Sequence, residues 1–147
     1  MRIAGSGDRA LVDEIKQSKG VSYLEYLDHA EVMRLVADSH LVIALYDPVR
    51  PINVMAAPNK LAEAFCAGRP VIINSEVLIG AEPEYQDAVI RTDYDDWRGL
   101  VEALDRLMES PDDYRRMCAA ARRNYEMFYS WGAVVQATNE VFARVGF

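Results

Sequence analysis

Residues 58–73 read Pro-Asn-Lys-Leu-Ala-Glu-Ala-Phe-Cys-Ala-Gly-Arg-Pro-Val-Ile-Ile. Pro58 suits the first turn of a helix, and the apolar stripe that follows ends at Gly68. Its members are Leu61, Ala62, Phe65 and Cys66. The next run, Pro-Val-Ile-Ile at 70–73, is short and β-branched, which is typical of a strand covered on both faces. The segment therefore predicts a helix that runs directly into a buried strand.

The same alternation extends along the whole chain. Apolar runs of strand length occupy residues 1–4, 21–24, 41–46 and 70–73, with a shorter one at 89–90. Helical periods begin near Asp8, Asp28, Pro58, Leu100, Ser110 and Ser130. Strands that alternate with helices favour right-handed βαβ units. We therefore expect an α/β fold, an open parallel sheet with helices on both faces (Rossmann-like), with loops at 47–57 and 80–84.

Composition limits the class of protein. The chain has 147 residues, 51% of them hydrophobic and 27% charged, which fits one globular domain spanning 1–147. Its 16 Lys and Arg against 23 Asp and Glu give a net charge of -7, so nucleic acid is not an expected partner. No apolar run reaches the length of a membrane-spanning helix. Cys66 and Cys118 suit reduced thiols, so we expect a cytoplasmic protein.

Metal binding is not predicted. His29 and His40 stand alone, without the clustered His, Cys or carboxylate spacing that a metal site needs. We expect neither a metal nor another cofactor.

In an open α/β sheet, ligands bind beyond the carboxyl ends of the strands. Gly5-Ser6-Gly7 follows the first strand and could admit a phosphate, although an ordinary strand-to-helix turn uses the same glycines. No acidic residue stands where a dinucleotide fingerprint needs one for the ribose. The pattern therefore disfavours NAD.

The start of the helix at Pro58 is a stronger candidate. The amides of Asn59, Lys60 and Leu61 should lack partners within the helix and point at an anion such as a diphosphate. Lys60 adds a positive charge, and Glu63, one turn further, could accept both hydroxyls of a ribose. The alternative is that Glu63 only complements the helix dipole and Lys60 is solvated.

Three segments resemble a known family: Ile3-Ala-Gly-Ser-Gly-Asp8, Val21-Ser-Tyr-Leu-Glu-Tyr-Leu27 and Glu63-Ala-Phe-Cys-Ala-Gly-Arg-Pro-Val-Ile72. Together they resemble the C-terminal, donor-binding half of GT-B glycosyltransferases of the retaining, nucleotide-sugar-dependent group 1. The closing segments Ser110-Pro-Asp112 and Phe128-Tyr-Ser-Trp131 are also similar to that family. The resemblance covers nearly the whole chain.

The resemblance implies a function. A nucleoside-diphosphate sugar would be the donor, and a glycan or lipid-linked molecule would accept the sugar through a domain that lies outside this chain. The implied nucleotide and diphosphate contacts are Asn59, Lys60, Leu61, Glu63, Gly5, Gly7, Tyr26 and Leu27. The catalytic residue stays unknown, and peripheral membrane attachment of the full-length protein stays open.

Two departures from the family pattern matter. The family has two glutamates separated by seven residues, and Glu63 matches the second, whereas Met55 occupies the first position. Asn53 or Asp47 could then contact the donor sugar instead. The chain also begins at what resembles the family's second strand, so we expect a fragment that is inactive alone and that forms a homodimer through its last helix or its open sheet edge.

Two other functions stay open at this point. A sugar-nucleotide epimerase of GT-B architecture would have a similar donor site. A non-catalytic nucleotide-binding α/β module would need no acceptor. The pattern does not decide the base, the sugar or the stereochemical outcome of transfer.

Overall fold

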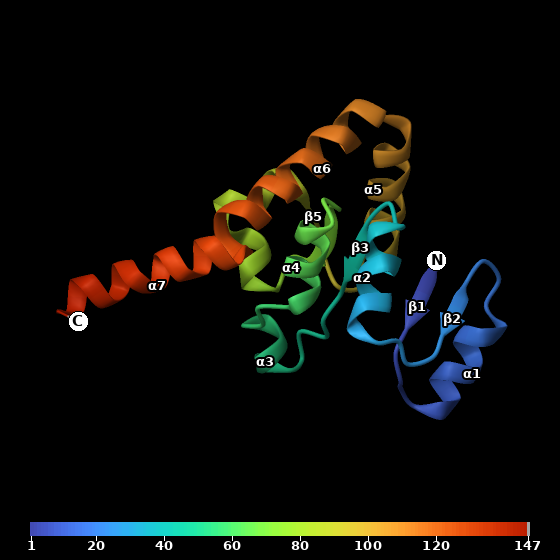
Figure 1. Ribbon diagram of the computed structural model, residues 1–147. Helices are drawn as coiled ribbons and strands as arrows, with labels where there is room; N and C mark the ends of the chain where they lie inside the picture. The colour runs from blue at the N-terminus through green and yellow to red at the C-terminus, as the bar shows by residue number, and fades with distance from the viewer. Residues whose placement is uncertain (147) are drawn as a thin grey trace. The chain divides into compact units, whose positions relative to one another are not determined.

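The computed structural model describes residues 1–146, which form two compact units. The first unit comprises Met1–Leu35, and the second begins at Val36. Both contain parallel β-strands connected by helices (Figure 1). The expected parallel α/β class is confirmed. The described strands pair as two sheets, one in each unit.

The first unit holds a two-stranded parallel sheet. Strand β1 (Arg2–Ala4) pairs with β2 (Ser22–Leu24), with Ile3 opposite Tyr23. Helix α1 (Arg9–Gln17) connects them, and the carboxylate of Asp8 caps it by accepting from the amides of Ala10 and Leu11. The sequence of strand, glycine turn and capped helix is as predicted.

Helix α2 (His29–Ala37) begins with a reciprocal cap and runs into the second unit. The amide of Glu31 donates to the Asp28 carboxylate at 2.7 Å, and the amide of Asp28 donates to the Glu31 carboxylate at 2.9 Å. This arrangement is a capping box with aspartate at the N-cap. The capping box expected from the spacing of these two residues is confirmed.

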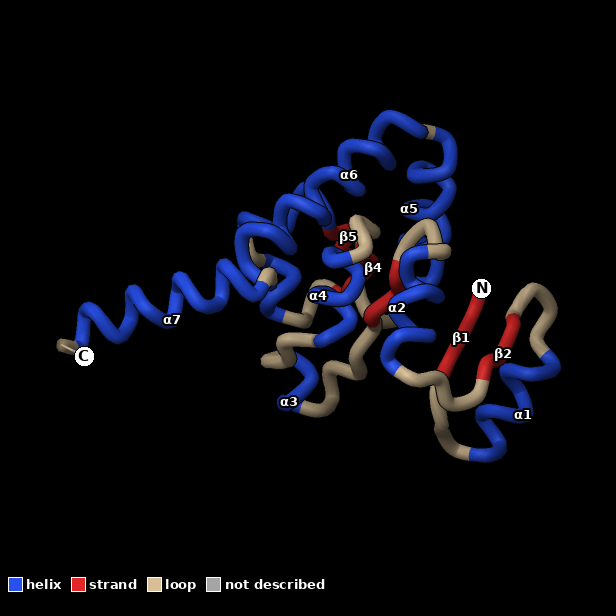
Figure 2. Tube along the Cα trace, viewed as in Figure 1, coloured by secondary structure: helices blue, strands red, loops and turns tan. Residues whose placement is uncertain are grey.

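The second unit is built on a three-stranded parallel sheet in the order β3-β4-β5. Figure 2 draws the strands in red and labels β4 and β5. The strands are β3 (Val42–Ala44), β4 (Val71–Asn74) and β5 (Val89–Thr92). Ile72 of the central strand lies opposite Ile43 on one side and Ile90 on the other. All four residues of β4 are fully buried, which explains the apolar run Val71–Ile73, and the strand ends at the polar residue Asn74.

Helix α4 (Asn59–Cys66) connects β3 to β4 and buries Leu61, Ala64 and Phe65 in the core. Its end is a Schellman motif: the amide of Arg69 donates to the Ala64 carbonyl at 2.8 Å, and that of Gly68 to the Phe65 carbonyl at 3.0 Å. Gly68 has a φ of 63°, which a residue with a side chain rarely adopts. The expected end of the helix at Gly68 is confirmed.

The rest of the second unit is helical. The segments are α5 (Trp97–Glu109), α6 (Pro111–Asn124), the π-helical η3 (Tyr125–Tyr129) and α7 (Trp131–Val145). The Ser130 hydroxyl caps α7 by accepting from the amide of Ala133. Figure 1 shows α7 extending away from the body of its unit, and none of its residues is buried. No helix among residues 1–146 combines the length and the apolar character needed to cross a membrane.

Several local expectations were wrong. The expected loop at 47–57 contains a short helix, α3 (Pro51–Val54), because proline fits the first position of a helix. Residues 80–84 overlap two 3₁₀ segments, η1 (Leu78–Ala81) and η2 (Pro83–Ala88). The strand expected at 41–46 ends at Ala44.

Two helix starts also differ from the expectation. Pro58 is the N-cap of α4 and not its first residue. Ser110 is the N-cap of α6, but its hydroxyl donates to the Asp113 carboxylate at 2.6 Å and caps no backbone amide. Neither difference moves a helix by more than its first turn.

The packing of Gly80 against β4 gives a test of this core. A Cβ on Gly80 would lie 2.7 Å from Cγ2 of Ile73. We therefore expect Gly80→Ala to lower the free energy of unfolding by about 1–3 kcal/mol, the usual cost of overpacking. Urea denaturation measures the change. Gly132→Ala is the control, since a Cβ there meets nothing within 4 Å and should leave stability unchanged or raised; equal effects of the two changes would refute the packing argument.

Candidate functional site

The carboxyl ends of β3, β4 and β5 carry a network of polar side chains. The Asn74 side chain, at the end of β4, accepts from the amide of Tyr46 at 2.8 Å and donates to the Tyr46 carbonyl at 3.1 Å. It also donates to the Glu76 carboxylate at 2.9 Å, and the amide of Tyr94 donates to that carboxylate at 3.3 Å. The network therefore connects the residues that follow all three strands.

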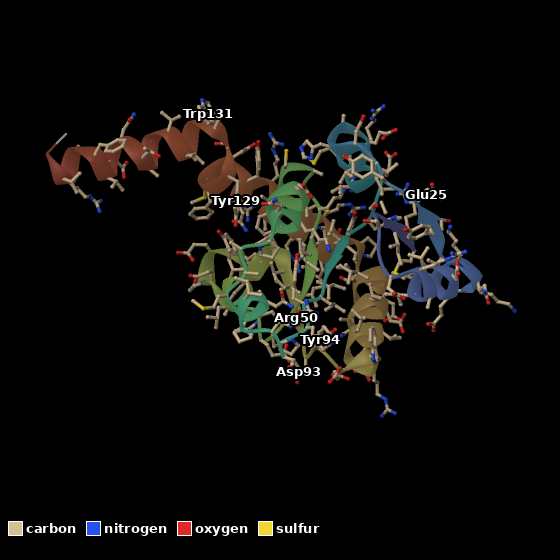
Figure 3. All side chains as sticks on the ribbon, turned by 90° about the horizontal axis from the view of Figure 1, so that it is seen from below. Glu25, Arg50, Asp93, Tyr94, Tyr129 and Trp131 are labelled. Atoms are coloured by element: carbon tan, nitrogen blue, oxygen red, sulfur yellow. The ribbon has the colours of Figure 1, made fainter. Side chains whose placement is uncertain are left out.

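Glu76 is held in its charged form. The hydrogen bond from Asn74, followed by backbone amides, lowers the pKa of Glu76 below its ordinary value. Figure 3 marks Asp93 and Tyr94, from the end of β5, along the same edge of the view as Arg50 from the loop after β3. The segments that follow the three strands thus carry basic Arg50 after β3 and acidic Glu76 and Asp93 after β4 and β5.

The start of α4 lies at the same edge, because α4 follows β3 and leads into the parallel strand β4. Within the described residues, the amides of Asn59 and Lys60 have no hydrogen-bond partner. The amide of Leu61 donates to the Pro58 carbonyl at 3.0 Å, and the Leu61 side chain is fully buried. The expectation that Leu61 offers a free amide is therefore wrong, because the first turn of α4 closes on itself.

Lys60 and Glu63 both interact with the side chain of Tyr46. The Lys60 ammonium is 5.5 Å from the centroid of the Tyr46 ring, within range of a cation–π contact. Burial and the negative charge of Glu63 raise the pKa of Tyr46 above its ordinary value. The structure therefore brings together the two charged side chains that the sequence singled out on this helix.

Asp47 and Asn53 are also adjacent. The Asn53 amide group donates to the Asp47 carbonyl at 2.8 Å, and the Asp47 carboxylate accepts from the amide of Val49 at 3.0 Å. Met55, at the position where the family has a glutamate, is 76% exposed. Both candidates for the donor-sugar contact therefore help to shape the loop between β3 and α4.

The remaining candidates belong to the first unit. The amide of Gly5 donates to the carbonyls of Leu24 and Glu25, each at 3.2 Å, and its carbonyl accepts from the Tyr23 hydroxyl. Gly5 has a φ of 126°, so a side chain there would be strained. Gly7 and Leu27 lie in the turns that follow β1 and β2, and Tyr26 is 84% exposed.

Two further observations concern the rest of the described chain. Among residues 1–146, no three His, Cys, Asp or Glu side chains lie close enough to hold a metal ion. A groove of 720 Å³ lies between η2, β5, α5 and α6, away from the start of α4. Its lining includes Arg106, Arg116 and Arg123, but Arg116 is paired with Asp113 of its own helix.

Three residues of this site were missed in the sequence: Tyr46, Asn74 and Glu76. Tyr46 was assigned to the strand at 41–46, and Asn74, directly after the strand at 70–73, was given no role. A polar residue that ends a buried strand at its carboxyl edge is a usable signal, since ligands bind there. Its hydrogen-bond partner, however, lies 28 residues away in the chain.

Comparison with known proteins finds a family that matches nearly the whole chain. A family model described as glycosyl transferase-like matches residues 1–140. The glycogen synthase of Mycobacterium tuberculosis, in strains CDC 1551 / Oshkosh and H37Rv, is 24% identical over 149 residues. That match covers 97% of this chain and 34% of the relative, so the chain spans about a third of the length of these relatives.

Two solved structures have a similar fold. Sucrose-phosphate synthase from Thermosynechococcus elongatus matches 98% of this chain and 38% of its own, with a TM-score of 0.66 and 17% identity. WaaG, a glycosyltransferase involved in lipopolysaccharide biosynthesis, matches 92% of this chain and 36% of its own, with the same TM-score and identity. None of these proteins is named as an epimerase.

The Glu76 network predicts a pH dependence of stability. A carboxylate whose pKa is lowered by folding stabilises the protein above its unfolded pKa, here near 4.5, and this contribution disappears as the pH falls through the lower folded value. Glu76→Gln should therefore destabilise the protein at pH 7, and the difference from the wild type should shrink at acidic pH. Urea titrations at several pH values measure it. Glu84→Gln, an exposed glutamate of η2, is the control; a difference independent of pH would contradict the role of the charge.

Proposed function

The chain belongs to the glycosyl transferase-like family, and on that premise we propose that it is the nucleotide-sugar-binding part of a glycosyltransferase. The full-length protein would move a sugar from a nucleoside-diphosphate donor to a glycan or lipid-linked acceptor. The acceptor would bind outside the part of the family that this chain spans. An epimerase or a non-catalytic module is not proposed, because the family match and the named relatives give neither any support.

One observation carries the proposal. Lys60 and Glu63 both lie at the Tyr46 ring, next to the two free amides at the start of α4. Amides at a helix start and an ammonium suit the phosphates of a nucleotide. A carboxylate one turn further along suits the two hydroxyls of its ribose. Gly5, Gly7, Tyr26 and Leu27 lie in the loops that follow β1 and β2 of the first unit. Their contact with the nucleotide stays an expectation from the family resemblance.

The chemistry of this site is electrostatic. When the bond between the sugar and the diphosphate breaks, negative charge develops on the departing phosphate oxygen. The amides of Asn59 and Lys60 and the Lys60 ammonium stabilise that charge without a metal. Asn53 and Asp47 lie in the loop between β3 and α4, where they can contact the sugar in place of the carboxylate lost at Met55.

We also propose a cellular location for the protein, from its cysteines. Cys66 and Cys118 are both free thiols, which supports a cytoplasmic location. Peripheral contact with a membrane would fit a lipid-linked acceptor.

Replacement of Glu63 tests the nucleotide site. Glu63→Ala should weaken the binding of the nucleoside diphosphate by about 1.5–3 kcal/mol, the range for a hydrogen bond to a charged group. Isothermal titration calorimetry with UDP, GDP and ADP measures the affinity and identifies the base. Glu102→Ala, which changes an exposed glutamate of α5, should have no effect. Unchanged affinity in a folded Glu63→Ala protein would remove Glu63 from the site.

The exposed face of α7 leads to a second proposal, that this chain self-associates. Val134, Val141 and Val145 share one face of the helix and are 44%, 57% and 61% exposed. Exposed apolar patches of this kind commonly mark protein contacts.

Sedimentation velocity tests this proposal. We expect a concentration-dependent dimer that Val141→Lys shifts to the monomer. Asn139→Lys, on the opposite face of α7, should leave the dimer unchanged. A strict monomer at high protein concentration would refute the proposal.

A further inference from the structure

Asn74 is unusual among the polar residues of the second unit. Its side chain is fully buried and makes three hydrogen bonds, two with the backbone of Tyr46, just before the loop that leads to the candidate site, and one with Glu76. None of the chemistry assigned above uses it. A buried amide with this many bonds costs little only while its partners stay in place.

We propose that Asn74 is a positioning residue of the diphosphate site, which clamps the backbone of Tyr46 so that the tyrosine ring holds the Lys60 ammonium beside the start of α4. This inference rests on the proposed function, because Lys60 acts there on a nucleoside diphosphate.

The first step of the argument concerns the backbone. The ladder between β3 and β4 ends where Ala44 lies opposite Ile73. Beyond that point the Asn74 side chain takes the place of a strand: its oxygen accepts from the Tyr46 amide and its nitrogen donates to the Tyr46 carbonyl. A backbone amide can only donate and a carbonyl can only accept, so the side-chain amide has one possible orientation. The direction of the chain at Tyr46 is therefore set by Asn74.

The Glu76 carboxylate strengthens this clamp. It accepts from the Asn74 nitrogen, while its other oxygen accepts from the amide of Tyr94 after β5. The Asn74 amide group is thus held from two sides, by the segment after β3 and by the segment after β4. Rotation of the amide would break at least two hydrogen bonds together.

The second step concerns the ring. With its backbone held, Tyr46 packs its side chain partly into the core, and the Lys60 ammonium lies 5.5 Å from the ring centroid. A lysine side chain is long and loses rotamer freedom when it is held. The contact with the ring offsets part of that loss before any ligand binds. It thereby holds the ammonium of a residue in the first turn of α4, the turn that carries the free amides of Asn59 and Lys60.

The chain provides internal references for a direct test. It contains three lysines, Lys16, Lys19 and Lys60. Lys16 lies 5.2 Å from the centroid of the Tyr23 ring, so its ε-methylene protons should show a ring-current shift. In a ¹H–¹³C correlation spectrum we expect Lys16 and Lys60 to be shifted upfield and Lys19 to be unshifted, with Lys60→Arg giving the assignment. An unshifted Lys60 in the folded wild type would overturn the proposal without any variant.

Variants then connect Asn74 to that signal. Asn74→Ser introduces no charge and removes the paired hydrogen bonds to the Tyr46 backbone. It should therefore move the Lys60 resonance toward that of Lys19 and leave the Lys16 resonance unchanged. Tyr46→Leu removes the ring and should do the same, whereas Tyr46→Phe keeps the ring and should not. An unmoved Lys60 resonance in folded Asn74→Ser would overturn the proposal. If Asn74→Ser does not fold, the wild-type spectrum and the two Tyr46 variants still decide whether the ring holds Lys60.

Binding measurements separate positioning from a merely structural role. We expect Asn74→Ser to weaken UDP, GDP or ADP binding by about two- to fivefold, as for an exposed cation–π contact, and to leave the matching nucleoside unaffected. In a Lys60→Met background the same change should have no further effect. Equal losses in both backgrounds, or equal losses for nucleoside and diphosphate, would overturn the proposal. A wild type that binds none of the three diphosphates would instead refute the proposed function, which the calorimetric titrations distinguish.

Discussion

The complete burial of β4 is the constraint on which the second unit depends. Val71, Ile72 and Ile73 have no exposed surface, so every neighbour must offer an apolar side to this strand. Phe65 of α4 packs in the core with this strand. Its ring also makes edge contacts with Tyr85 of η2 and Tyr129 of η3, at centroid distances of 5.5 and 6.1 Å. The central strand and one aromatic residue thus organise the helices around the sheet.

Burial of the strand also explains where polar groups gather. A strand covered on both faces can carry polar side chains only at its ends, because a buried polar group without partners is costly. Asn74 is the last residue of β4 and satisfies its amide with Tyr46 and Glu76. The polar edge at the start of α4 is therefore a direct result of the apolar interior. The chain places its candidate ligand contacts where the packing leaves room for hydrogen bonds.

Most elements could be predicted from the sequence because their signals are local. The Asp28 and Glu31 cap, the stop at Gly68 and the buried run of β4 each depend on residues within a few positions of one another. The contact of Asn74 with Tyr46 could not be predicted, since the two residues are 28 positions apart and meet only after the strands pair. The occupied amide of Leu61 and the helix α3 were missed because they depend on the detailed path of single turns.

The tight turn at Gly68 gives the segment from Lys60 to Asn74 an uncommon property. Helix α4 and strand β4 are joined with almost no intervening chain, and the two ends of the segment meet again through the Tyr46 residue. The segment thus forms a ring that is covalent along most of its length. The ring is closed by the hydrogen bonds between Asn74 and Tyr46 and by the contact of Lys60 with the Tyr46 side chain. A movement of Lys60 away from the Tyr46 ring, or of Asn74 away from the Tyr46 backbone, would open this ring. The start of α4 and the end of the central strand therefore share one residue, Tyr46, through which an anion held by Lys60 would be connected to the core of the sheet.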